Sequence, residues 1–396
     1  MKFKFILFAG FLFLISTCRM PSDPIGEINI LKRLNTINTG GDCLDLDIDL
    51  DDSVIVAAAN YNGFKLYDIQ FTGNLISELI ERTHITSFEM DKNIGDNRAQ
   101  IVKIASLNNK AFILDKEDHI WLLDYNNSID TVSAFLSKGS PSCYDARSIS
   151  IAIRESINDI RIFSLIKHYS SGSYWFEDSK SIINAKFDLL NLNEETECNY
   201  MLNKNENSNV IFYSESLLIL GVGELGVQVF SIEVADENTC IYLNNMGEMI
   251  LAILDEDNDC LSLDNGFIIN EGELIPGVIW EFDTPGEVEA LYSISNSIFA
   301  GLSKSNGFIK VQLNSDGSIT DYSQYGIGYS IKGIHHNGNI LAVAAGHDGV
   351  LLYNWDGVNL SFKGRIDTAY ANNVKVALNV IFIATEDGID IIQVEI

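Results

Sequence analysis

The sequence predicts an all-β protein, a β-propeller built from four-stranded antiparallel blades. The main observation is a nine-residue stretch, YNGFKLYDI from Tyr61, which recurs along the chain. The third residues of its eight copies are Gly63, His119, Asp159, Gly226, Gly266, Gly307, Gly349 and Gly388. Successive copies are 56, 40, 67, 40, 41, 42 and 39 residues apart. A period near forty, with strands in each unit, is typical of propeller blades.

The second observation is the order of strands and turns inside one unit. Four strands are expected, over residues 44–50, 54–59 and 64–69 and from residue 75. The first alternates apolar residues with Asp, and the second is continuously apolar, as in a strand covered on both faces. Asp51-Asp52 and Asn62-Gly63 supply turn chemistry between the strands. No segment has a 3.6-residue apolar period over three turns, so helices are not expected.

The third observation concerns how the ring closes. The last unit stops at Ile396 after three strands, and residues 28–36 (INILKRLNT) resemble the fourth strand of the preceding unit, residues 360–368. An N-terminal strand that completes the C-terminal blade would close the ring and remove its exposed edges. We therefore expect one domain over residues 26–396. Eight blades are preferred, but the unit at about residues 144–182 matches weakly, so seven remains open.

The N-terminus has the features of an export signal. Lys2 and Lys4 precede an apolar run over residues 5–15, which is too short to span a bilayer. Residues 14–18 (LISTC) resemble a bacterial lipoprotein signal, although Thr17 stands where a smaller residue is usual. We expect residues 1–17 to be removed, Cys18 to be lipidated, and residues 18–25 to be a tether. Ordinary cleavage nearby is the alternative, and in both cases the chain is exported.

Composition limits the classes of partner. The formal net charge is −29, from 55 acidic and 26 basic residues, and such a field repels phosphate backbones. We expect no nucleic acid partner and no membrane contact beyond the lipid. The charge is compatible with cationic partners or divalent metal, but an acidic soluble surface is the simpler explanation and the one we favour. Besides Cys18 there are five widely spaced cysteines without zinc-ligand spacing, and we expect most of them to be buried and inert.

The repeat also carries a family resemblance. The stretches SVIVAAANYNGFKLYDI from Ser53, NILAVAAGHDGVLLYNWDG from Asn339 and NVIFIATEDGIDIIQV from Asn379 resemble the LVIVD-repeat proteins. The resemblance extends over nearly the whole chain after Cys18. It implies an exported bacterial lipoprotein with a β-propeller fold. It implies little about function, because that family's role is mostly undefined and a fold does not fix a function.

The candidate metal site is a column of carboxylates on the first strand of the first unit. Asp45, Asp47 and Asp49 lie on one face of this strand. If that face meets the central channel, the three carboxylates would suit a Ca²⁺ ion with oxygen ligands. The alternative interpretation is a solvated acidic channel lining.

Other motifs are weaker. Residues 221–226 spell G-x-G-x-x-G, but the alternating pattern that follows predicts a strand and not the helix that a dinucleotide site needs. Residues 255–259 are acidic without the glycine of a calcium-binding EF-hand loop, and we interpret them as a hairpin turn. His335, His336 and His347 are expected in exposed turns. We identify no catalytic or cofactor-binding residue.

Two long links stretch the period, over residues 82–98 and 183–208. Long loops on a rigid scaffold often carry binding, and drift in surface loops is the alternative. The sequence favours a cell-envelope lipoprotein that binds an envelope protein or polymer through its loop-rich face. The alternative function is a channel-mouth enzyme, such as a metal-assisted hydrolase or lyase.

Overall fold

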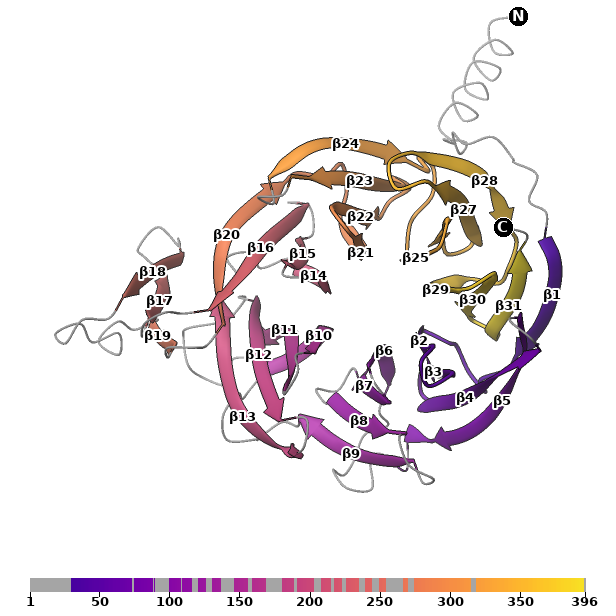
Figure 1. Cartoon of the computed structure of the whole chain (residues 1–396), viewed down its shortest axis with the longest axis horizontal. Coiled ribbons are helices and arrows are strands. Elements are labelled where there is room, and N and C mark those ends of the chain that lie inside the picture. The colour runs from indigo at the N-terminus through magenta and orange to yellow at the C-terminus, as the bar shows by residue number, and fades with distance from the viewer. Residues whose placement is uncertain are drawn as a thin grey trace, which may run out of the picture.

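The structure, a computed structural model, is a ring of antiparallel sheets around a central channel, as Figure 1 shows. It describes residues 30–394 except residues 73–74, 88, 90–99, 108, 116–119, 126–129, 137–145, 156–158, 169–179, 189–190, 203–207, 215–216, 223–225, 235–238, 244–248, 254–265, 270–273 and 315–317. The predicted all-β propeller with four-stranded antiparallel blades is confirmed. In this part of the chain no helix is long and apolar enough to cross a membrane.

Within the described residues, seven sheets have four strands each. The first three blades, from the channel outward, are β2 (Asp45–Asp49), β3 (Val54–Ala58), β4 (Phe64–Thr72) and β5 (Leu75–Ile85); β6 (Ile101–Leu107), β7 (Lys110–Asp115), β8 (Ile120–Asp124) and β9 (Thr131–Leu136); and β10 (Ala146–Glu155), β11 (Asp159–His168), β12 (Lys180–Asp188) and β13 (Asn191–Leu202).

The next blades are β14 (Ser208–Ser214), β15 (Leu217–Val222), β16 (Val227–Val234) and β20 (Leu274–Phe282); β21 (Val288–Ile294), β22 (Ser297–Leu302), β23 (Phe308–Leu313) and β24 (Ile319–Tyr325); and β25 (Gly333–Asn337), β26 (Ile340–Ala344), β27 (Val350–Trp355) and β28 (Leu360–Ile366). The last blade is β29 (Ala371–Ala377), β30 (Val380–Thr385), β31 (Gly388–Val394) and β1 (Ile30–Ile37).

The preference for eight blades is wrong. The copy at Gly266 begins β19 (Gly266–Ile269), which pairs with β17 (Thr239–Leu243), and β17 pairs with β18 (Met249–Ile253). This three-stranded sheet lies outside the ring in Figure 1, between β16 and β20 of one blade. The insertion over residues 235–273 is nearly as long as a blade, so it preserves the period of about forty residues without adding to the ring.

A second correction concerns the third blade. The copy at Asp159 begins β11, the second strand of that blade and not the third. The blade therefore continues through β12 and β13, which occupy most of the expected long link over residues 183–208. The other expected link begins inside β5, which ends at Ile85, and residues 90–98 lie outside the described residues.

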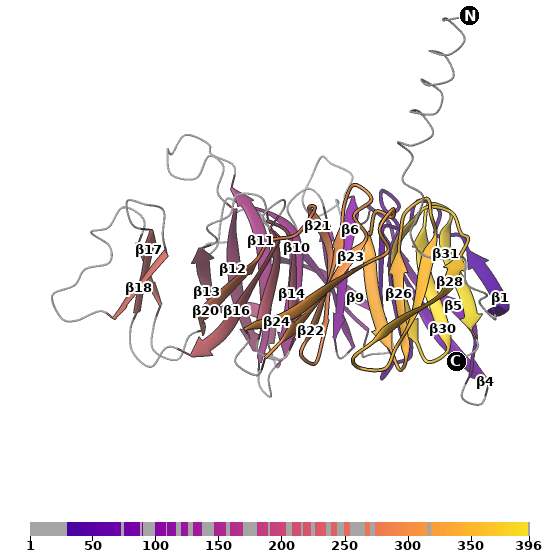
Figure 2. The ribbon, with the colours of Figure 1, turned by 90° about the horizontal axis from the view of Figure 1, so that it is seen from above.

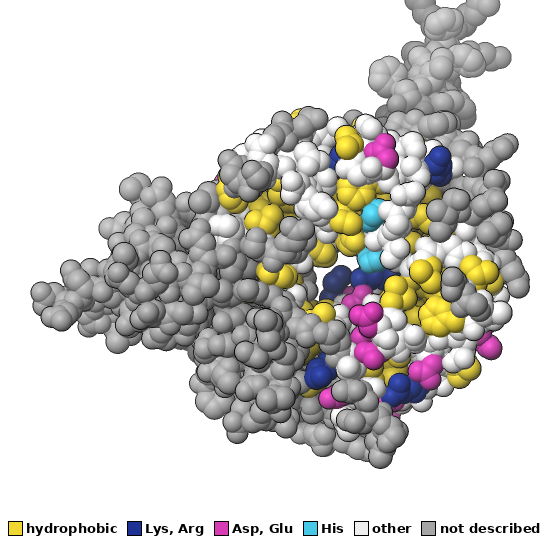
Figure 3. Space-filling model, in the orientation of Figure 1, with side chains coloured by type: hydrophobic (Ala, Val, Ile, Leu, Met, Phe, Trp, Pro, Cys, Tyr) yellow, Lys and Arg dark blue, Asp and Glu magenta, His cyan; other side chains and the backbone are white. Residues whose placement is uncertain are grey.

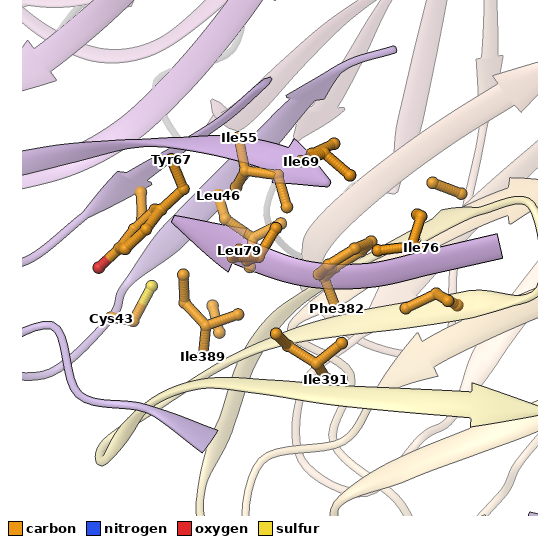
Figure 4. Close-up of a cluster of buried hydrophobic side chains, with 14 residues drawn as sticks. Cys43, Leu46, Ile55, Tyr67, Ile69, Ile76, Leu79, Phe382, Ile389 and Ile391 are labelled. Carbon is orange, nitrogen blue, oxygen red and sulfur yellow. The ribbon is translucent and has the colours of Figure 1, made fainter. Parts of the chain in front are cut away.

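The predicted ring closure is confirmed. β1 pairs antiparallel with β31, with Thr36 opposite Asp390 and Ile37 opposite Ile389. The seam between this last blade and the first blade contains a buried apolar cluster, shown in Figure 4. Leu46 and Ile55 of the first blade meet Phe382 of the last blade there.

The recurring glycine marks a tight contact between a turn and the outermost strand. Gly349 and Gly388 have φ angles of +75° and +127°, and a Cβ atom on them would lie 2.2 and 2.0 Å from the carbonyl oxygens of Ile366 and Ile37. Gly63, Gly226 and Gly307 make the same kind of contact with β5, β20 and β24. Only glycine accepts both the conformation and the contact. We call the ring face that carries these turns and the links between blades the marker-turn face; in the side view of Figure 2 the strands run between it and the opposite face.

Candidate functional site

The central channel is lined by the innermost strand of each blade. β2, β6, β10, β14, β21, β25 and β29 each contact the next around a closed ring. They enclose a cavity of about 310 Å³ to which all of them contribute residues. In Figure 3 the channel opens at the centre of the molecule, and charged and His side chains gather on one side of the opening.

The predicted carboxylate column lies at this channel, where it joins two blades. An Oδ atom of Asp45, Asp47 and Asp49 accepts the backbone N–H of Ile104, Ser106 and Asn109, at 2.9, 2.7 and 3.1 Å. The donors belong to β6 and the loop after it, at an edge where no strand of the same sheet pairs with them. A buried N–H without an acceptor is destabilising, and these carboxylates supply the acceptors that a further strand would have given.

Two other seams use the same device with different side chains. Ser150 Oγ on β10 accepts the N–H of Ile211 on β14 at 3.3 Å. His335 Nδ1 on β25 accepts the N–H of Val376 on β29 at 3.1 Å. In each case a side chain of one innermost strand caps the N–H edge of the next innermost strand along the chain.

Basic groups surround the carboxylate column. Lys375 Nζ lies 2.7 Å from Asp47, and Lys103 Nζ lies 3.6 Å from Asp45. Burial opposes ionisation of Asp47, but the Lys375 ammonium and the Ser106 N–H hold the pKa of its carboxyl below the ordinary value. Burial likewise opposes the charge on Lys375, and the carboxylates of Asp47 and Asp45 raise its pKa above the ordinary value. Both partners are therefore charged at neutral pH.

The residues that line the cavity exclude one of the two interpretations of the carboxylate column. The cavity is lined by the acids Asp45, Asp47 and Glu289 and by the bases Lys103, Lys332 and Lys375, so an acidic lining is wrong. Among the described residues, no three His, Cys, Asp or Glu side chains are grouped as a metal site. The carboxylates of Asp45, Asp47 and Asp49 are contacted by backbone N–H groups, and those of Asp45 and Asp47 also by Lys ammonium groups. A Ca²⁺ ion at these three residues stays a prediction.

The histidines differ from the expectation. His335 and His336 lie on β25 and not in an exposed turn. Burial and the nearby Lys375 ammonium lower the pKa of His335 to about 3, so the ring is neutral and, with Nδ1 accepting from Val376, protonated on Nε2. His336 is buried, and its ring packs edge-on against Trp355 with centroids 4.7 Å apart. His347 is exposed in its turn, as expected.

The other predicted positions are the lipidation site, the acidic stretch, the cysteines and the glycine-rich motif. Residues 1–29, with Cys18 and the tether, and the acidic stretch 255–259 lie outside the described residues. Cys43 is a free, fully buried thiol, and burial, followed by the charge of Asp45, raises its pKa. Gly226, the last glycine of the G-x-G-x-x-G motif, is followed by a strand, β16.

The architecture is shared with solved structures of very different sequence. No family model and no curated protein matches the chain. The RRP9 WD40 repeats superpose with a TM-score of 0.58 and 9% identity over 93% of this chain and 100% of that one. A chain of the mitotic checkpoint complex gives 0.57 and 10% over 96% and 95%, and U3-55K gives 0.53 and 10% over 95% and 100%. The fold is a WD40-like β-propeller. At such low identity the likeness extends to the fold alone.

The sequence located the carboxylate column but missed the residues that meet it. These residues come from four other blades: Lys103, Glu289 and Lys375 lie on the innermost strands β6, β21 and β29, and Lys332 directly precedes β25. The signal was a charged residue between apolar or glycine neighbours at a first strand: Lys103, Glu289 and Lys332 lie at or near the start of the strand, whereas Lys375 is the fifth residue of β29. Aligning the units by their first strands, and not by the recurring glycine, would have brought Lys103, Glu289 and Lys332 together, but not Lys375.

Proposed function

We propose that this chain is an interaction scaffold that holds a macromolecular partner on its marker-turn face. One observation carries the proposal: an exposed tyrosine on a turn that is fixed by hydrogen bonds from its neighbours. Tyr61 is 56% exposed. Its carbonyl accepts the Ser87 hydroxyl at 2.6 Å, and the next carbonyl, of Asn62, lies 2.9 Å from His84 Nε2. A rigid aromatic anchor binds a partner with little loss of side-chain entropy.

The turns around the ring are fixed in the same way. Gln324 Nε2 on β24 donates to the Asn306 carbonyl at 2.8 Å, which corresponds to the His84 contact in the first blade. The Asn62 side chain also donates to the Gly40 carbonyl in the link from the last blade. Binding surfaces are commonly built from such loops on a rigid framework.

Charge on this face favours a basic partner. Several acidic side chains are exposed in its turns and links, namely Asp42, Asp283, Asp367, Glu386 and Asp387. Fewer basic side chains are exposed there among the described residues, Lys304 and Arg365 being the examples. Complementary charge would steer a cationic segment or polymer to the face and fix its orientation.

We place this scaffold at the cell envelope. The proposal rests on the export signal, on Cys18 as the lipidated residue and on the resemblance to LVIVD-repeat lipoproteins. The chain of the mitotic checkpoint complex is a solved example of this fold within an assembly. Replacing Cys18 with Ala should release the chain from the membrane fraction and abolish incorporation of labelled fatty acid. Unchanged labelling and fractionation of that variant would contradict lipid anchoring at Cys18.

The binding proposal is tested by affinity capture from envelope extracts with the full-length chain as bait. Tyr61→Ala and the charge-reversed pair Glu386→Lys/Asp387→Lys should each reduce the recovered partner at least about tenfold, the effect expected of an interface hot spot. The reversed pair should also lose the salt dependence of the capture.

Each variant has a matched control. Tyr322→Ala removes a tyrosine of similar exposure, 58%, from the outer strand β24. Asp51→Lys/Glu78→Lys reverses two exposed charges away from the marker-turn face, in the β2–β3 turn and on β5. The proposal fails if the controls weaken capture as much as the test variants do.

A further inference from the structure

The central cavity is a candidate ligand site that is separate from the marker-turn face. Its volume of about 310 Å³ lies at the lower end of the range for small-molecule sites, roughly 300–1,000 Å³. It is bounded by innermost strands held by backbone ladders and side-chain caps, so its walls are pre-formed. A cavity of this volume can hold a small molecule but not a macromolecule.

One wall of the cavity is charged but balanced. It contains three ion pairs: Asp45 with Lys103, Asp47 with Lys375 and Glu289 with Lys332. The last pair joins β21 to the residue before β25, and its side chains are 29% and 30% exposed. Lys103 is 38% exposed. These side chains are therefore partly accessible from the cavity, and the two charges within each ion pair compensate each other.

The opposite wall is apolar. β10 contributes Ile151 and Ile153, and β14 contributes Val210 and Phe212. Phe212 packs edge-on against Tyr292 with ring centroids 5.8 Å apart, so an aromatic surface adjoins the charged wall. A ligand that fills the space would meet ions on one side and hydrocarbon on the other.

We propose that this cavity binds a small zwitterion with an apolar or aromatic body, of the size of an amino acid or dipeptide. The ligand carboxylate would pair with Lys332 and its ammonium with Glu289, so every charge of the wall stays compensated. A ligand with a single charge would leave one member of the wall pair uncompensated in a partly buried place, which is unfavourable. The apolar body would lie against Phe212 and the isoleucines of β10, where its burial contributes most of the affinity.

The test uses the purified full-length chain in detergent, with binding measured by calorimetry and by the shift in melting temperature. The probes are phenylalanine, the dipeptide Phe-Phe, leucine, alanine, N-acetylphenylalanine and phenylalaninamide. The aromatic zwitterions should bind and raise the melting temperature. Alanine and both singly charged analogues should bind at least about tenfold more weakly.

Variants locate the site. Lys332→Met and Glu289→Gln should each weaken binding of the aromatic zwitterions about tenfold or more, and Phe212→Leu should weaken the aromatic ligands relative to leucine. Arg365→Met removes a cation from the marker-turn face, where Arg365 lies 2.9 Å from Asp367, and should leave the affinity unchanged. Lys103→Met serves as a second channel variant if Lys332→Met does not fold.

Three results would overturn the proposal. They are no binding by either aromatic zwitterion, equal binding of the blocked analogues, and affinity unchanged by the channel variants. None of them bears on capture of a macromolecule through Tyr61, so the two proposals fail separately.

Discussion

Strand β2 has two faces, and they join the first blade to its surroundings by different means. Leu46 is fully buried in the apolar cluster shared with the last blade. Asp45, Asp47 and Asp49 alternate with the apolar residues and cap the N–H edge of β6. The apolar face contributes by removing surface from water, whereas the polar face contributes by satisfying donors that would otherwise be buried without partners. A polar residue in an alternating strand is therefore not always a solvent-facing residue.

The largest loss of stability at pH 7 is expected from the apolar face. Leu46→Ala should lower the free energy of unfolding by about 2–5 kcal/mol, because it removes buried methyl groups and leaves a cavity beside Phe382. Leu50→Ala is the control, since Leu50 lies in the β2–β3 turn and is 37% exposed. Urea unfolding of both variants measures the difference. Similar losses for the two would show that this cluster does not hold the seam.

Truncation on the polar face is expected to have the next largest effect. Asp49→Ala removes the acceptor of the Asn109 N–H, 3.1 Å away, and the nearer acceptor of the Tyr125 hydroxyl, 2.9 Å away, which then retains only the Lys110 carbonyl at 3.4 Å. We expect a loss of about 1–3 kcal/mol. Asp49→Asn keeps an acceptor oxygen and should lose less. Asp51→Ala, an exposed turn position, should change stability by no more than about 0.5 kcal/mol. If Asp49→Ala is as mild as Asp51→Ala, the capping role is wrong.

The fold was predictable from the sequence where local signals repeat. The prediction failed where two different structural features give the same sequence signal. The period, the strand order and the match between residues 28–36 and 360–368 were enough for the propeller and its closure. The insertion over residues 235–273 has the length of a blade, so counting copies could not distinguish it from one. At Asp159 a polar turn between two apolar runs looks the same whether it follows the first strand of a blade or the second.

The candidate site was half predictable for a similar reason. Alternation placed Asp45, Asp47 and Asp49 on one face of a first strand, and the structure places two of them, Asp45 and Asp47, on the channel wall. Their acceptor role depends on which N–H groups of β6 lack a strand partner, about sixty residues further along the chain. No local pattern encodes that relation, because it arises only when the first two blades pack side by side.

The ion pair on the polar face gives a smaller effect that depends on pH. Asp47→Asn should cost on the order of 1 kcal/mol at pH 7, because Asn still accepts from Ser106 but does not attract Lys375. The folded pKa of Asp47 lies below the ordinary value of 3.8, so its contribution is present above that pH and is lost as pH falls through the folded value. Urea midpoints from pH 7 to pH 3 should therefore show wild type and variant converging only in acid. A gap that stays constant would show that the charge of Asp47 contributes nothing.

The smallest effect at pH 7 is expected where a neutral side chain performs the same capping. His335→Gln retains an acceptor for the Val376 N–H, and His335 is already neutral at pH 7, so stability there should change little. Below about pH 6.5 the unfolded chain binds a proton at this residue, whereas burial and Lys375 keep the folded ring neutral down to about pH 3. Wild-type stability should thus fall with decreasing pH by up to about 1.4 kcal/mol per unit in this window, and the variant should lack that slope. Asp47→Asn, which also lies beside Lys375, should keep the slope between pH 6.5 and pH 4. If His335→Gln falls as steeply as the wild type there, the imidazole is not held neutral, and the cap on β29 is not equivalent to the carboxylates on β6.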